Sequence, residues 1–216
     1  MTPTTPVDRL TITFLVDNCI EWMTKLPPGF AHELPQHLQL YPDVDDVTGV
    51  PVVDFNHFCC GPDDKSLVRN VAAMKIPVDR IGRVVTSHWH RDHTGGLLSL
   101  LNLRQSLKPQ HSCVVDVHPD RPLARGIAPG PNFDKVACAL PQDPTFELIE
   151  NAGGIVEKND KGHAVAGGTV WVSGEIPRIT PFEAGILGGM RWFQEPGEEG
   201  QWRHEQVSLD IEKRFL

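Results

Sequence analysis

The sequence predicts an α/β fold, and three observations carry that prediction. Segments typical of strands and helices alternate through the centre of the chain, from residue 63 to residue 119. Hydrophobic residues make up 40% of the 216 residues, which is enough for a core of ordinary size. No internal repeat or linker divides the chain. We therefore expect a single domain over residues 1–216.

Each element is predicted by its own pattern. Alternating or continuous apolar residues between turn-forming residues indicate strands, and apolar residues three or four positions apart indicate helices. In chain order these patterns predict a strand at residues 10–16, a loop at 21–46, a strand at 50–55, a helix at 63–77, a strand at 81–86, a helix at 94–107, a strand at 111–119, a loop at 125–135, a helix at 144–154 and a strand at 168–177. The tail at 205–216 fits a strand and a short helix equally well.

Charge and composition exclude several classes of protein. The formal net charge of -8 disfavours a nucleic-acid binder, which normally carries a basic face for phosphates. The sequence does not begin with basic residues followed by an apolar run, so it does not indicate a signal peptide. It also contains no stretch of about 18 apolar residues, so it does not indicate a membrane span. Five cysteines without C-x-x-C spacing favour reduced thiols over disulfides. We expect a soluble, cytoplasmic protein that binds neither nucleic acid nor membrane.

The stretch TSHWHRDHTGG, residues 86–96, holds the main candidate site. It lies between a predicted strand and a predicted helix, where side chains are often free for chemistry. On an extended backbone His88 and His90 project to the same side and can share one ion. Asp92 and His93 follow in the turn and can face a second ion. Nitrogen and carboxylate donors suit zinc, with iron or manganese as alternatives. A solvated polar turn is the usual explanation of one histidine, but four such residues together favour a metal site.

The segment SHWHRDHTGG resembles the signature of the metallo-β-lactamase-fold superfamily. The segments LVDN, VDVHPD, GEIPRITPFE and HEQ are similar, in the same order, to the branch of dihydropterin-aminobenzene-phosphate synthase-like and fungal lactamase-like metallohydrolases. This resemblance implies an αββα sandwich with one or two ions at its edge. It also implies that His88 and His90 bind the first ion, that Asp92 and His93 bind the second, and that Asp92 orients the nucleophile. Asp54 would support a ligand.

The end of the chain departs from this family pattern. Relatives supply a further histidine from a GCSH-like segment and another late histidine, and neither segment occurs here. We therefore expect a sandwich that is incomplete at the C-terminus, whose uncovered strand edges favour association into a homo-oligomer. His118 fits a polar strand end, His163 a hairpin loop and His204 a surface position, so none of them is assigned as a ligand.

The sequence then predicts a metal-dependent hydrolase of a small molecule with a lactam, ester or amide bond. One alternative is an enzyme acting on a phosphorylated pterin-like substrate, for which Arg121, Arg125 and Arg178 are the candidate phosphate ligands. Another alternative is a truncated or inactive metal-binding remnant. Trp89 is expected to pack in the core, and Glu175 and Arg178 are expected to form an ion pair at a strand end.

Overall fold

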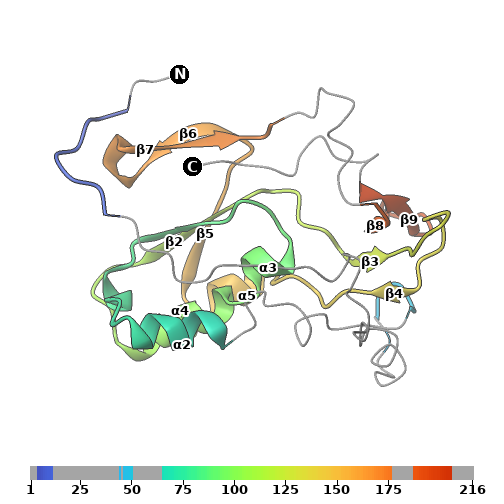
Figure 1. The fold of residues 1–216 in the computed structure, drawn as a ribbon, viewed down its shortest axis with the longest axis horizontal. Coiled ribbons are helices and arrows are strands. Elements are labelled where there is room, and N and C mark those ends of the chain that lie inside the picture. The colour runs from blue at the N-terminus through green and yellow to red at the C-terminus, as the bar shows by residue number, and fades with distance from the viewer. Residues whose placement is uncertain (1–3, 12–43, 45, 51–64, 177–186, 206–216) are drawn as a thin grey trace, which may run out of the picture.

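The computed structural model describes residues 4–11, 44, 46–50, 65–176 and 187–205, and it has an α/β architecture (Figure 1). Helices and strands alternate in its first half, as the sequence predicts. The helices are α2 (Ser66–Ala73), α3 (Arg91–Thr94), α4 (Leu97–Ser106) and α5 (Phe146–Asn151), with single 3-10 turns at Val78–Arg80 and Ala166–Gly168. The strands are β1 (Arg83–Val85), β2 (Cys113–Val117), β3 (Arg125–Ile127), β4 (Cys138–Ala139), β5 (Gly154–Lys158), β6 (Lys161–Val165), β7 (Val170–Gly174), β8 (Gly189–Phe193) and β9 (Gln201–His204).

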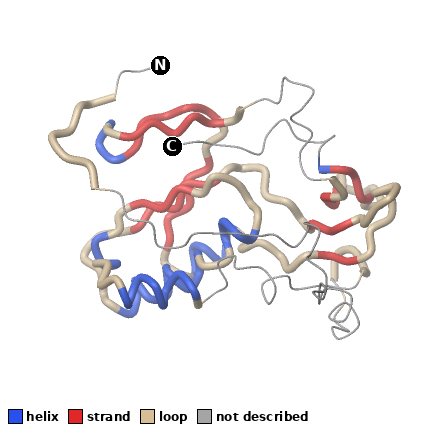
Figure 2. Tube along the Cα trace, in the orientation of Figure 1, coloured by secondary structure: helices blue, strands red, loops and turns tan. Residues whose placement is uncertain are grey.

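A parallel sheet of order β1-β2-β5 forms the centre of the fold. Its helices α2, α4 and α5 gather on one side, as Figure 2 shows. Val115 and Val117 of β2 are fully buried and pack with Leu101 of α4 and Ile149 of α5. Because side chains alternate along a strand, Asp116 projects from the opposite face, away from these helices.

Two further groups of strands complete the described part of the structure. β4, β3, β8 and β9 form an antiparallel sheet in that order, and β6 and β7 form an antiparallel hairpin. In Figure 1 the hairpin lies on the side of β2 and β5 that faces away from the helices. The antiparallel sheet lies to the right of α3 and α5 in the same view. Residues distant in the sequence therefore meet at the ends of the parallel strands.

Most predicted elements within the described ranges are confirmed with shorter bounds. The helices predicted at 63–77, 94–107 and 144–154 are α2, α4 and α5, and the strands predicted at 81–86, 111–119 and 168–177 are β1, β2 and β7. Residues 10 and 11 are not in a strand. The rest of the strand at 10–16, most of the loop at 21–46, the strand at 50–55 except its first residue, and the tail after residue 205 lie outside the described residues.

One predicted loop is wrong at its start, although residues 128–135 are loop as predicted, and one predicted hairpin loop is wrong. Residues 125–135 begin with β3, which pairs with β8 more than 60 positions later in the chain (Arg125 with Arg191). On its other side β3 pairs with β4, and Gly126 permits that close approach, because a Cβ there would lie 2.9 Å from the carbonyl oxygen of Cys138. His163 lies in β6 rather than in a hairpin loop. In both places the strand depends on a partner, which a local pattern of glycine and polar residues does not reveal.

Two buried cysteines fit the prediction of reduced thiols. Cys113 and Cys138 are free and buried in β2 and β4. Burial raises the pKa of Cys113, and it raises the pKa of Cys138 to about 11. Both thiols therefore stay protonated at neutral pH and act as small apolar core residues. No helix in the described ranges is long and apolar enough to cross a membrane.

The core of the parallel layer can be tested at two adjacent positions of α5. Ile149 is fully buried, whereas Leu148 is 47% exposed. We expect Ile149→Ala to lower the free energy of unfolding by about 2–4 kcal/mol, because it leaves a cavity in the core. Leu148→Ala should lower it by less than about 1 kcal/mol. Urea unfolding followed by circular dichroism measures both, and equal losses would contradict the described packing of α5.

Candidate metal centre

The histidine turn, residues 86–94, begins where β1 meets β2. Thr86 is buried, and its N–H donates to the carbonyl oxygen of Asp116 at 3.0 Å, continuing the pairing of the two strands. Trp89 is 5% exposed, donates from Nε1 to the carbonyl oxygen of His118 at 3.0 Å, and packs edge-on against Phe146. The predicted core role of Trp89 is thus confirmed. Its indole ties the middle of the turn to the core.

The three predicted histidine ligands lie together. The ring of His88 lies 4.5 Å from that of His90 and 4.1 Å from that of His93, measured between centroids. The backbone of His90 is extended at φ -72° and ψ 144°, directly before α3 begins. The hydroxyl of Ser87 lies 3.1 Å from Nδ1 of His88 and 3.0 Å from Nδ1 of His93. Asp92 follows in α3, and its side chain lies outside the described part of the structure.

Glu205 is a neighbour of this group that the sequence analysis did not assign. It is buried directly after β9, and its Oε1 lies 3.4 Å from Nε2 of His90, 115 positions earlier in the chain. The segment HEQ contains it, but no period or spacing marks it as a site residue. Within the described ranges, no group of three or more His, Cys, Asp or Glu side chains is arranged to hold one metal ion.

The far end of the turn is held by a buried ion pair. Thr94 is fully buried, with its hydroxyl 3.3 Å from the carbonyl oxygen of His90 and 3.4 Å from Oδ1 of Asp143. Asp143 in turn accepts two hydrogen bonds from Arg125 of β3, at 2.9 Å from Nε and 2.7 Å from NH2. This two-bond geometry adds both energy and directional specificity to the pair. The antiparallel sheet is therefore attached to the end of α3.

Two of the three unassigned histidines already have partners at both ring nitrogens. Nδ1 of His118 accepts the N–H of Asp120 at 3.1 Å, so Nε2 carries the proton and donates to Glu175 at 2.8 Å. This contact is a hydrogen bond from a neutral ring to the Glu175 carboxylate. The ion pair expected between Glu175 and Arg178 stays a prediction, because Arg178 lies outside the described residues. Nδ1 of His163 lies 2.9 Å from the carbonyl oxygen of Lys161, and its Nε2 contacts Asp116. Neither ring can bind an ion without losing these contacts.

His204 is the third unassigned histidine, and its position differs from the prediction. It lies in β9, paired with Met190 of β8, and it is half-buried rather than on the surface. Its neighbour Glu205 is the residue that reaches the histidine turn.

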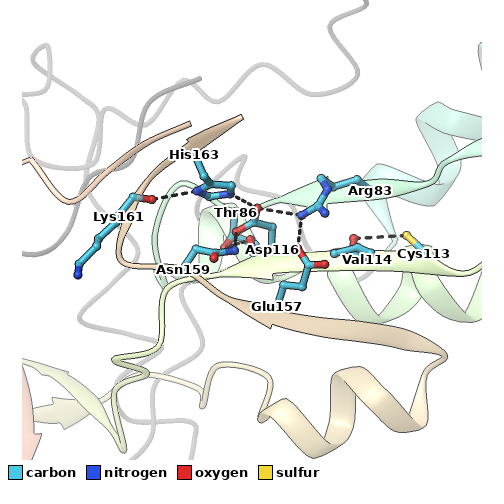
Figure 3. Close-up of polar contacts among 9 residues, drawn as sticks. All are labelled: Arg83, Thr86, Cys113, Val114, Asp116, Glu157, Asn159, Lys161 and His163. Atoms are coloured by element: carbon cyan, nitrogen blue, oxygen red, sulfur yellow. Dashed lines mark hydrogen bonds and ion pairs between the residues drawn. The ribbon is translucent and has the colours of Figure 1, made fainter. Parts of the chain in front are cut away.

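A buried carboxylate fastens the β6–β7 hairpin to the parallel sheet. The side chain of Asp116 is fully buried and contacts His163 at 2.7 Å, Arg83 at 3.0 Å and Asn159 at 3.1 Å (Figure 3). Arg83 also donates to Glu157 at 2.7 Å. Burial by itself lowers the pKa of Arg83, but its contacts with Glu157 and Asp116 outweigh that effect and raise it. One guanidinium thus pairs with two carboxylates at this position.

Comparison of the chain with protein-family models, with curated proteins and with solved structures finds no match.

The arginines suggested as phosphate ligands make contacts within the chain. Arg125 is paired with Asp143. Arg121 donates to the carbonyl oxygens of Pro144 at 2.9 Å and Asp143 at 2.6 Å. Burial lowers the pKa of Arg121, with the charge of Arg125 acting in the same direction and that of Asp143 opposing it. Arg178 and the suggested supporting residue Asp54 lie outside the described residues.

The ion pair between Asp143 and Arg125 leads to a prediction about stability. Asp143 and Arg125 are 4% and 6% exposed. We expect Asp143→Ala to lower the free energy of unfolding by about 3–5 kcal/mol, because it leaves a buried guanidinium without its carboxylate. The exposed Asp134 is the matched control, and Asp134→Ala should change stability by less than about 0.5 kcal/mol. Denaturant unfolding measures both, and a loss as small as that of the control would show that the pair does not hold the turn.

Proposed function

We propose that this chain is a metal-dependent hydrolase with a metallo-β-lactamase-type αββα sandwich, acting on a small molecule with a lactam, ester or amide bond. The observation that carries the proposal is the meeting of His88, His90 and His93 in one turn, with Glu205 facing His90. Imidazole nitrogen and carboxylate oxygen are the donors expected for zinc, and they also suit iron or manganese.

The distance between His90 and Glu205 fits two ligands of one ion. Bonds of about 2.0–2.1 Å at tetrahedral angles place neighbouring donor atoms about 3.4 Å apart. Nε2 of His90 and Oε1 of Glu205 are separated by 3.4 Å, which is longer than the usual hydrogen bond of about 2.9 Å. Glu205 therefore offers the first ion a third ligand in place of the late histidine that the sequence lacks.

Two of the three sheets in the described residues support the sandwich. A parallel sheet covered by helices carries the histidine turn, and a separate antiparallel sheet carries Glu205. In the proposed arrangement the site forms where these two layers meet. An ion bound there would supply Lewis-acid polarisation of the substrate and activation of water. Trp89 and Thr94 hold the backbone of the turn, and Asp92 orients the attacking nucleophile.

The phosphorylated pterin-like substrate is supported less well. A phosphate pocket needs basic side chains directed at the ligand. Arg121 and Arg125 instead bind backbone carbonyls and a buried carboxylate. The inactive metal-binding remnant differs from the hydrolase in a measurable way, because it predicts a folded protein that hydrolyses no substrate, whether or not it holds metal.

Metal content tests the proposal directly. Purified wild-type protein should hold one to two equivalents of metal by plasma mass spectrometry, and the His88→Ala and His90→Ala double variant should hold none. Glu205→Gln should weaken zinc binding by at least about tenfold. Glu195→Gln, at an exposed position, is the matched control and should bind as the wild type does. A folded wild-type protein without metal after zinc reconstitution would overturn the proposal in favour of the remnant.

Activity tests the assigned role of Asp92. We expect Asp92→Ala to abolish hydrolysis of chromogenic lactam and ester substrates, because the nucleophile loses the group that orients it. The circular dichroism spectrum should remain that of the wild type. Hydrolysis at the wild-type rate in this variant would refute the proposed role.

A further inference from the structure

We propose that Ser87 is a positioning residue whose single hydroxyl orients His88 and His93 and selects the tautomer in which both rings present Nε2 to metal. This inference rests on the proposed metal-dependent function. Its basis is the position of the Ser87 oxygen, 3.1 Å from Nδ1 of His88 and 3.0 Å from Nδ1 of His93. Both contacts are of hydrogen-bond length.

Counting donors and acceptors shows what the hydroxyl can do. A serine hydroxyl has two acceptor lone pairs and one proton to donate, and a neutral imidazole has one nitrogen of each kind. Ser87 can therefore accept an N–H from both Nδ1 atoms at once and donate its own proton elsewhere. Alternatively it accepts from one ring and donates to the other. In the first arrangement both Nε2 atoms have a free electron pair for a metal, and in the second only one has.

Metal binding favours the first arrangement. A histidine ligand almost always donates its second ring N–H to an oxygen acceptor, which sets both the tautomer and the ring angle. Here one oxygen provides that acceptor for two rings. Passing from the second arrangement to the first requires rotation of the Ser87 hydroxyl and transfer of one ring's proton from Nε2 to Nδ1 through solvent. Neither change requires the rings to move far, so both histidines can become ligands close to their present positions.

The backbone around Ser87 is held in place on both sides. Thr86 is bonded to β2 through the carbonyl of Asp116, and Trp89 is anchored to the carbonyl of His118. The hydroxyl therefore projects from a short segment with little freedom to shift. The contact between the rings of His88 and His93, with centroids 4.1 Å apart, further restricts their rotation. A residue without a hydroxyl at position 87 would leave both Nδ1 atoms without this shared partner.

The test compares Ser87→Ala with Ser87→Thr, which retains a hydroxyl. Ser106→Ala is the matched control, because it removes a serine hydroxyl bonded to Leu103 in α4, away from the turn. Nitrogen chemical shifts of the imidazoles, recorded on metal-free protein at pH 8, report which nitrogen carries the proton. Competition titration with a chromogenic chelator measures zinc affinity. We expect Nδ1–H forms at His88 and His93 in the wild type, their loss in Ser87→Ala, and a fall in zinc affinity of about 10- to 100-fold. Ser87→Thr and Ser106→Ala should stay near the wild type.

The outcomes separate this inference from the proposed function. Zinc affinity of Ser87→Ala equal to that of the wild type, or Nε2–H forms at both rings in the wild type, would overturn the role of Ser87 even if the protein binds metal. A wild-type protein that binds no zinc, yet shows Nδ1–H forms that disappear in Ser87→Ala, would support the role of Ser87 in orienting the rings. That same result would overturn the proposed metal-dependent function.

Discussion

The rest of the described structure depends on the contacts made by the buried carboxylate of Asp116. A charge removed from water is costly unless it is paired and hydrogen-bonded, and this one contacts Arg83, Asn159 and His163. These partners come from β1, from the turn after β5 and from the β6–β7 hairpin, so one group joins the parallel sheet to the hairpin. The backbone oxygen of the same residue binds Thr86, where the histidine turn begins.

The histidine turn is consequently held by elements on several sides. Its start is bonded to β2, its middle is anchored through Trp89, and its end is tied through Thr94 to the Asp143–Arg125 pair. Such support matters for a metal centre, because ligands must be held within about 0.5 Å of their working positions. The turn itself contributes histidines to the site, and the packing around it determines how closely their rings approach.

Much of the fold follows from local patterns in the sequence. The helix α4 and the strand β2 are indicated by runs of apolar residues that serve the same core, and both are found with slightly shorter bounds. β3 and β6 are not indicated in this way. Their residues are rich in glycine, charge and short side chains, and they become strands because β8 and β7 offer hydrogen-bonding partners. Pairing between distant segments is not encoded in the period of either segment alone.

The candidate site likewise has a part that follows from local sequence and a part that depends on pairing between distant segments. The sequence by itself determined that His88, His90 and His93 lie close together, because they are near neighbours in a turn between a strand and a helix. The tertiary structure alone decided that Glu205 faces His90, and that His118 and His163 have other partners. The physical reason is the separation of the contacting residues along the chain. Spacing along the chain sets the geometry of residues a few positions apart, whereas the meeting of residues 47 to 115 positions apart depends on how the separate sheets and loops pack.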